Sequence, residues 1–147
     1  MSGITLVCPH CAAVNRLLQE RLDGAPRCGV CHKPLFNGAV LAVDEAALAR
    51  HMRHDGIPLL VDVWAAWCGP CRAMAPQFQQ AAVALEPRFR LLKLDADSAA
   101  ATMSRHGISS IPTLLLFAGG QLRARQAGAM AAQQIVQWAR QNSGERT

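Results

Sequence analysis

Six cysteines are arranged as three Cys-x-x-Cys pairs, a spacing that supports either metal binding or thiol–disulfide exchange. Cys68 and Cys71 follow an apolar run, residues 58–65, and the pattern of residues 71–85 is helical. Side chains three residues apart are neighbours on a helix, so both thiols face the same way. The positive end of the helix favours a thiolate at Cys68. A partly ionised thiol beside a second thiol is what disulfide exchange requires.

The alternative for Cys68 and Cys71 is half of a zinc site. Such a site generally needs a second pair, and the two remaining pairs match each other better. Pro70 suits the first helical turn, where its missing N–H costs nothing, and it removes an N–H that could support a metal-bound sulfur. The predicted strand, turn and helix therefore favour redox chemistry at this pair.

The other two pairs predict a zinc site within residues 1–36. Sixteen residues separate Cys8 and Cys11 from Cys28 and Cys31, which fits the two-knuckle pattern C-x₂-C-x₁₅₋₂₀-C-x₂-C. Four thiolates form a preferred tetrahedral ligand set for one Zn²⁺. So short a segment has little apolar core, and metal would be its main source of folding free energy.

Three alternatives remain open for the first segment. His10 or His32 could replace one cysteine as a ligand. Two disulfides could form, although a reducing compartment disfavours them. Cys8-Pro9-His10-Cys11 could itself be a redox site, but no buried strand precedes it and no helical pattern follows it.

The remaining pattern predicts one domain with a mixed sheet covered by helices. At 147 residues, 51% hydrophobic and 17% charged, the chain can form one ordinary core with a small appendage. A strand and a turn are expected at residues 14–19 and 23–26. Further strands are expected at residues 39–43, 58–65, 89–95, 113–118 and 121–126. Helices are expected at residues 45–53, 71–85, 98–106 and 131–142, the second of them broken or bent at Pro76.

Composition also argues against several classes of partner. The net charge of +5 is scattered, so a nucleic-acid-binding face is not expected. No apolar run approaches the ~18 residues of a membrane span. The first residues lack the pattern of a signal peptide, which predicts a cytoplasmic protein. No nicotinamide or flavin motif is present, so no organic cofactor is expected.

Four features together resemble the thioredoxin family. They are Asp62 six residues before Cys68, the Trp67-Cys68-Gly69-Pro70-Cys71 motif, Ile111-Pro112-Thr113 before a strand, and Gly128 after the last strand. The resemblance covers about residues 39–142, and with the zinc knuckles in front the whole chain resembles the zinc-containing second thioredoxins of bacteria. It implies a thioredoxin fold at residues 37–147, behind an N-terminal zinc ribbon of residues 1–36.

The same resemblance assigns roles to the reacting groups. Cys68 would attack a substrate disulfide, Cys71 would resolve the mixed disulfide, and Asp62 would accept the proton of Cys71. Because Asp62 stands in an apolar run, burial should raise its pKa. The alternative role for Asp62 is a structural ion pair with Lys93.

Residues implied to contact substrate are Trp67, Gly69, Pro70, Ile111, Pro112 and Gly128. The Ile111–Pro112 bond is expected to be cis, as it is in the family. For Trp67, simple packing is an equal alternative to partner contact. The five histidines are expected to be surface or packing residues. Val63 and Arg72 depart from the common family residues without affecting the chemistry.

The function implied is a cytoplasmic protein-disulfide reductase that holds one Zn²⁺ in a tetrathiolate site. Its substrates would be proteins with disulfides, and its electrons would come from NADPH through a flavin-containing thioredoxin reductase. One alternative is a disulfide oxidase or isomerase. Another is a zinc-dependent binding or chaperone module in which redox chemistry is secondary.

Overall fold

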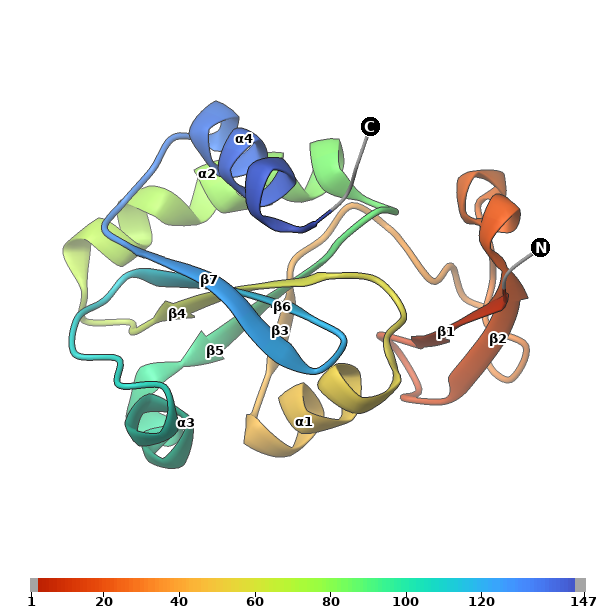
Figure 1. The fold of residues 1–147 in the computed structure, drawn as a ribbon, viewed down its shortest axis with the longest axis horizontal. Helices are drawn as coiled ribbons and strands as arrows, with labels where there is room; N and C mark the ends of the chain where they lie inside the picture. Colours follow the sequence, from red (N-terminus) through yellow and green to blue (C-terminus); the bar gives the residue numbers. More distant parts are fainter. Residues whose placement is uncertain (1–2, 145–147) are drawn as a thin grey trace.

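The computed structural model describes residues 3–144, which form a small N-terminal part and a larger sheet-based part (Figure 1). The small part contains an antiparallel pair of strands and a 3₁₀ helix: β1 (Gly3–Val7), β2 (Val14–Leu18) and the 3₁₀ helix Gln19–Gly24. Strand β2 and a turn were expected here. Strand β1 was not predicted, and the 3₁₀ helix overlaps only the first two residues of the turn expected at 23–26.

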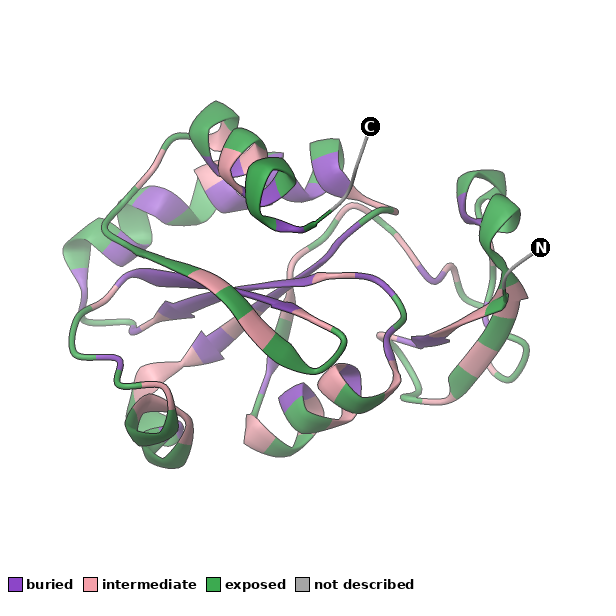
Figure 2. Ribbon diagram, in the orientation of Figure 1, coloured by how far each residue is buried: buried purple, intermediate pink, exposed green. Residues whose placement is uncertain are grey.

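The larger part is a five-stranded mixed sheet in the order β3-β5-β4-β6-β7. Its strands are β3 (Leu41–Val43), β4 (Leu59–Trp64), β5 (Arg90–Asp95), β6 (Thr113–Ala118) and β7 (Gln121–Ala127). Strands β3 and β4 lie parallel to β5, whereas β6 is antiparallel to both β4 and β7. The central strands β4 and β6 are almost wholly buried, which explains their continuous apolar sequences (Figure 2).

Four α-helices cover the sheet, and they are α1 (Glu45–His54), α2 (Gly69–Leu85), α3 (Ala100–Arg105) and α4 (Ala132–Asn142). Helices α2 and α4 lie on one face and α1 and α3 on the other (Figure 1). Alternation along the strands gives each face its own core. Leu60 packs with Met74 and Phe78 of α2, while Val61 packs with Leu48 of α1.

Local sequence signals account for most boundaries. The Asp44 side chain accepts a hydrogen bond from the Ala47 N–H at 2.7 Å and so caps α1. Gly119 and Gly120 both have positive φ, +61° and +76°, as the tight turn between β6 and β7 requires.

Helix α2 continues without a break through Pro76, so the predicted break is wrong. Proline removes one helical N–H but is exposed, while the buried face of α2 includes Cys71, Met74 and Phe78. Packing of that face against the sheet offsets the lost hydrogen bond.

The two parts are joined by a short segment and by direct contact between β1 and the loop after α1. The Gly56 N–H donates to the Thr5 carbonyl at 2.8 Å. Ile57 lies in a buried cluster with Leu6 and Leu35. A Cβ at Gly56 would lie 3.2 Å from the Ile4 Cβ, so a larger residue would push the ribbon and this loop apart by a few tenths of an ångström. Within the described range, no helix is both long and apolar enough to cross a membrane.

Candidate active site and metal centre

The dithiol lies where β4 ends and α2 begins. Cys68 is the N-cap of α2, and its sulfur accepts a hydrogen bond from the Cys71 N–H at 3.2 Å. Pro70 occupies the first turn, as its missing N–H predicts. Cys68 and Cys71 form a disulfide with their Cα atoms 5.2 Å apart. The structure therefore has this pair in its oxidised state.

The two cysteines differ in how much surface they expose. Cys68 is 6% exposed and Cys71 only 1%. Both pack with Ala65, and the half-buried Trp64 and Ile111 cover the cluster. A thiol at Cys68 is therefore the more accessible of the two to an incoming disulfide.

The loop before β6 lies against the dithiol. The Ile111–Pro112 peptide bond is cis, which confirms the expectation. The carbonyl oxygen of Ile111 is 3.9 Å from the Cys68 sulfur. Gly128, with φ of +98°, donates its N–H to the Pro112 carbonyl at 2.9 Å. Four residues from three chain segments are thus brought together.

Trp67, Gly69 and Pro70 form the exposed rim of the dithiol. Trp67 is 67% exposed, and its Nε1–H donates to the Asp97 carboxylate at 2.9 Å. So large an exposed surface does not fit a packing role for the indole. No atom lies within 4 Å of a Cβ built at Gly69, so the surface beside the dithiol is open.

Asp62 is a buried carboxyl on the sheet face that α2 covers. It is 4% exposed, and its Oδ1 has no hydrogen-bond partner among the described residues. Burial raises its pKa to about 7, and the positive charge of Lys93 opposes that rise. Lys93 is opposite Asp62 in the strand register, but its ammonium lies 5.0 Å from the ring centroid of Trp64. Within residues 3–144 the two make no salt bridge, so the ion-pair interpretation has no direct contact to support it.

The four remaining cysteines meet at one point of the small part. The sulfurs of Cys8, Cys11, Cys28 and Cys31 all lie within 4.8 Å of one another. The Cys8–Cys31 and Cys11–Cys28 sulfur distances are both 3.6 Å. A tetrahedral site with Zn–S bonds of ~2.3 Å has sulfurs about 3.8 Å apart. The arrangement therefore fits one zinc ion bound by four sulfurs.

Residues 39–141 match the thioredoxin family, and the chain has relatives along nearly its whole length. The chain belongs to the thioredoxin family. Residues 7–33 match a second family, described as the N-terminal part of thioredoxin 2. Both halves of the predicted organisation, the thioredoxin fold and the zinc ribbon, are confirmed.

The relatives include thioredoxin C-3 of Corynebacterium nephridii, 35% identical over 90% of this chain and 91% of its own length. Thioredoxin of Haemophilus influenzae is 36% identical over 70% of this chain and 96% of its own length. A mutant thioredoxin from Halobacterium salinarum superposes with a TM-score of 0.67 at 25% identity, over 76% of this chain and 97% of its own. The protein is thus a thiol–disulfide oxidoreductase of the thioredoxin type.

The two knuckles of the zinc ribbon repeat one backbone arrangement. The Cys8 carbonyl accepts the Ala12 N–H at 3.0 Å, and the Cys28 carbonyl accepts the His32 N–H at 2.9 Å. Ala12 and His32 both have φ of 66°, so the chain turns sharply after the second cysteine of each pair. Asn15 ties the knuckles together, since it donates to the Cys28 sulfur at 3.4 Å and accepts from Gly29 N–H at 2.8 Å.

Hydrogen bonds favour a charged sulfur in the ribbon. The backbone N–H of Cys31, followed by the Asn15 amide, lowers the pKa of Cys28 to about 5. In the described part of the chain the metal-spaced group contains four cysteines and no histidine, so His10 and His32 are not members of it. These donors stabilise the thiolate form at Cys28, whereas burial and the neighbouring thiols raise the pKa of Cys11 to about 11.

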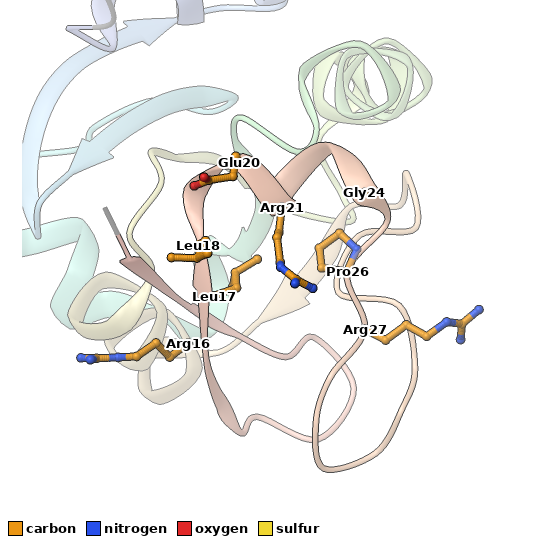
Figure 3. Close-up of a pocket in the computed structure, with 8 residues that line it drawn as sticks. All are labelled: Arg16, Leu17, Leu18, Glu20, Arg21, Gly24, Pro26 and Arg27. Carbon is orange, nitrogen blue, oxygen red and sulfur yellow. The ribbon is translucent and has the colours of Figure 1, made fainter. Parts of the chain in front are cut away.

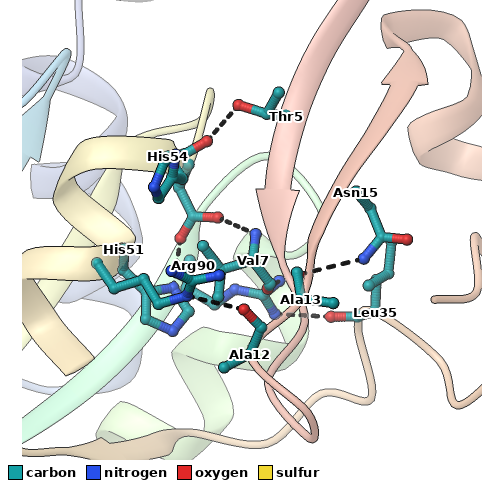
Figure 4. Close-up of polar contacts among 11 residues, drawn as sticks. Thr5, Val7, Ala12, Ala13, Asn15, Leu35, His51, His54 and Arg90 are labelled. Atoms are coloured by element: carbon teal, nitrogen blue, oxygen red, sulfur yellow. Dashed lines mark hydrogen bonds and ion pairs between the residues drawn. The ribbon is translucent and has the colours of Figure 1, made fainter. Parts of the chain in front are cut away.

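Sequence reasoning missed the buried polar residues between the ribbon and the thioredoxin domain (Figure 4). The guanidinium of Arg90 donates to the carbonyls of Leu35 and Val7, at 2.7 and 3.2 Å. Asp55 accepts the Val7 N–H at 2.8 Å and bonds His51 through its other oxygen. A charged residue inside the apolar run of β5 was the available signal for Arg90.

Nothing in the sequence indicated that His51 and Asp55 also take part in this contact. His51 is 3% exposed and hydrogen-bonded, whereas the sequence suggested only a surface or packing residue. Asp55 ends α1 as its C-cap, and its side chain is in addition the acceptor for β1. His51 lies in α1 and Asp55 follows its last residue. They are four residues apart, a spacing that places them on one face. Their role depends on the packing of β1 against that face, which the sequence does not show.

Proposed function

We propose that this protein reduces disulfides in other proteins through the Cys68–Cys71 pair. The observation that carries the proposal is this disulfide at the N-terminus of α2, with the Ile111 carbonyl 3.9 Å from the Cys68 sulfur. An oxidised pair at this place is the product of the reaction in which a substrate gains two electrons. Reduction of the pair then restores the starting dithiol.

In the first step, the Cys68 thiolate attacks one sulfur of a substrate disulfide. A bond forms between Cys68 and that sulfur, the substrate S–S bond breaks, and the other substrate sulfur leaves as a thiolate. The free N–H groups and dipole of α2 stabilise the attacking thiolate, and the Cys71 N–H already donates to this sulfur at 3.2 Å.

In the second step, Cys71 loses its proton and its sulfur attacks Cys68. The mixed disulfide breaks, the second substrate sulfur leaves, and the Cys68–Cys71 bond forms. Asp62 is the group that we assign to accept the proton of Cys71. Its pKa of about 7 supports this role, because such a carboxyl both accepts and releases protons near neutral pH.

Substrate binding is assigned to the surface around the dithiol. The exposed Trp67, Gly69 and Pro70 form one side of it, and Ile111, Pro112 and Gly128 form the other. The backbone beside Ile111 and Gly128 is suited to pair with an extended substrate segment. This places the scissile disulfide over Cys68.

The zinc ribbon, residues 1–36, is assigned one Zn²⁺ held by Cys8, Cys11, Cys28 and Cys31. The metal would supply folding free energy to the ribbon and takes no part in the exchange. Whether oxidation releases it is a question of regulation. No organic cofactor is proposed.

Reducing equivalents would come from NADPH through thioredoxin reductase, as the family relationship suggests. The protein would act in the cytoplasm, because a reducing compartment keeps four zinc thiolates from oxidising. The boundary between ribbon and thioredoxin domain is placed after residue 36.

Reduction of insulin disulfides tests the proposal. The full-length zinc protein should catalyse the reaction with dithiothreitol, and Cys68→Ser should abolish catalysis while zinc content stays at one ion per chain. Full activity of Cys68→Ser would contradict the mechanism and favour a zinc-dependent binding module. Measuring the reduction potential of the pair separates a reductase, whose potential lies near −270 mV, from an oxidase or isomerase nearer −180 to −120 mV.

A further inference from the structure

A small pocket adjoins the surface that we assign to substrate binding. It has a volume of about 220 Å³, and its lining comes from residues 107–110, Thr113, Arg125 and Ala127. Ser110 directly precedes Ile111, whose carbonyl lies 3.9 Å from the Cys68 sulfur. Ala127 directly precedes Gly128 on the neighbouring segment. Both segments on this side of the dithiol therefore supply walls of the pocket.

A larger hollow, of about 590 Å³, lies on the zinc ribbon and not beside the dithiol. Figure 3 shows that Arg16 and Arg27 of its lining extend away from it. In Figure 1 the ribbon lies at the far end of the molecule from the start of α2. The smaller pocket, by contrast, is next to the place where a substrate disulfide meets Cys68.

Arg125 is the one charged side chain among the described residues that line the small pocket. It crosses from β7 to the end of α3, where its Nη1 donates to the His106 carbonyl. A Cβ built at Gly107 would lie 3.9 Å from both terminal nitrogens, so the guanidinium lies beside that glycine. Within residues 3–144 the ion pairs involve other side chains. The remaining donors of Arg125 are thus available to a ligand.

Positive charge gathers at this end of the pocket. Burial, and then the charges of Arg105 and Arg125, lower the pKa of His106. The lining residues that the structure describes include no carboxylate. Ser109 and Ser110 are exposed, and in the described part of the chain neither hydroxyl has a hydrogen-bond partner. A guanidinium beside free hydroxyl groups suits a carboxylate ligand.

The distance from the dithiol gives the place of that carboxylate in a substrate. Arg125 stands three residues before Gly128, which is about 10 Å of extended chain. A substrate segment that lies along Gly128 covers the same distance in about three residues. A carboxyl side chain about three residues from the cysteine that Cys68 attacks therefore reaches Arg125.

We propose that this pocket selects protein disulfides that have an acidic residue close to the reacting cysteine. The Asp or Glu carboxylate of the substrate pairs with the Arg125 guanidinium, while the backbone beside Ile111 and Gly128 holds the segment. The inference rests on the proposed reduction of protein disulfides and names a class of substrate for that reaction. Arg125 acts in substrate binding and takes no part in the exchange of sulfur bonds.

The rate of the first attack on matched peptides tests this inference. Each short peptide carries its cysteine as a mixed disulfide with 2-thiopyridine, and has Glu, Gln or Lys three residues before or after that cysteine. The Cys68 sulfur bonds the peptide sulfur, the peptide–thiopyridine S–S bond breaks, and pyridine-2-thione leaves and is followed by its absorbance. The full-length zinc protein carries Cys71→Ser, so that the reaction stops at the mixed disulfide.

The measured quantity is the ratio of the rate constants for the Glu and Gln peptides within each protein, because a change in the reactivity of Cys68 cancels in this ratio. With the Arg125 protein, the ratio should be about three at low salt for one of the two Glu positions, and Lys should react more slowly than Gln. Arg125→Gln should bring the ratio to about one, and Arg125→Glu should bring it below one. At about 1 M salt the ratio should also approach one, since the Debye length falls to about 3 Å.

Two further variants separate the charge of Arg125 from other effects. Arg125→Lys keeps the charge and should keep a ratio above one, although the guanidinium that bonds the His106 carbonyl is gone. Arg140→Glu is the matched control, because it makes the same change of net charge at an exposed position of α4, on the other face of the sheet. It should leave the ratio as it is in the Arg125 protein.

Equal rates for the Glu and Gln peptides with the Arg125 protein would overturn the inference and leave the reductase function standing, with at most a site for small free anions at Arg125. A ratio that stays at three in Arg125→Gln, or falls equally in Arg140→Glu, would also overturn it. If Cys68 attacks none of the peptides, the proposed function itself is wrong.

Discussion

At the scale of single residues, Asp62 shows what residue type and position can and cannot predict. A carboxyl inside the apolar run of β4 predicted a raised pKa, and burial does raise it to about 7. The choice between proton acceptor and ion pair depended on where the Lys93 side chain lies. That side chain turns to Trp64, 5.0 Å from its ring centroid. Strand register shows which residues lie opposite each other, but the side-chain rotamers determine which of them are in contact.

Asp62→Asn should change stability in a pH-dependent way. The folded pKa of about 7 exceeds the unfolded value, so the folded state binds the proton more tightly. Stability that is complete below about pH 4 is therefore lost as the pH rises through 7. Because the substitution removes this loss, it should raise the free energy of unfolding at pH 8 by at most roughly 4 kcal/mol. At pH 4 it should have little effect.

Urea unfolding of the oxidised protein at both pH values measures this difference. Stopped-flow resolution of a mixed disulfide should also be slower in Asp62→Asn, with the first attack by Cys68 nearly unchanged. If Asp62→Asn is less stable at pH 8 and resolves the mixed disulfide at the parent rate, Asp62 has the structural role of an ion pair with Lys93.

The unequal exposure of the two thiols gives a second prediction. In the reduced protein, iodoacetamide should modify Cys68 much faster than Cys71 below pH 8, because the thiolate at the helix end is both ionised and accessible. Cys71→Ser should accumulate mixed disulfides through Cys68, detected by mass spectrometry. Faster labelling of Cys71 would reverse the two roles.

At the scale of elements, periodic sequence predicted all five strands of the main sheet and all four helices near their observed bounds. The exceptions have physical reasons. Proline at position 76 removes one hydrogen bond, and the packed face of α2 outweighs that loss. Strand β1 was missed although its partner β2 is the next strand of the chain, with Val7 opposite Val14. Its contact with the loop at Asp55, by contrast, joins residues that are far apart in the sequence.

The loop after α1 should therefore contribute to ribbon docking. Asp55→Ala removes the acceptor for the Val7 N–H, leaves His51 buried with one partner fewer and takes away a negative charge near Arg90, so it should cost about 1–3 kcal/mol. Asp55→Asn retains an acceptor and is the control. Amide exchange at Val7, measured on the zinc protein, should become faster in Asp55→Ala and stay close to the parent in the control.

At the scale of the whole molecule, two parts with different sources of stability share one chain. The thioredoxin domain has two apolar cores, one on each side of its sheet. The ribbon has one small cluster, which includes Cys8 and Cys28 themselves. The shortness of residues 1–36 had led us to expect little apolar core in that segment.

Metal loss should therefore separate the two parts. Treatment with peroxide and a chelator, followed by reduction of the dithiol, should release zinc and unfold the ribbon while the sheet keeps its structure. A protein of residues 37–147 should fold and reduce insulin. Zinc content, circular dichroism and the insulin assay on the same samples check this. Failure of the truncated chain to fold would show that the ribbon is part of one cooperative unit.

Besides the proposed zinc ion, Arg90 also joins the two ends of the ribbon segment. One guanidinium donates to the carbonyls of Val7 and Leu35, which flank the four clustered cysteines in the sequence. When metal leaves, the chain between these residues becomes a closed loop and not a free arm, and a closed loop has less conformational entropy to lose on reordering. In the metal-free ribbon, the two hydrogen bonds of Arg90 thus hold the ends of this loop together. The metal-free parent protein should then bind zinc again faster than a variant that lacks the Arg90 hydrogen bonds to Val7 and Leu35.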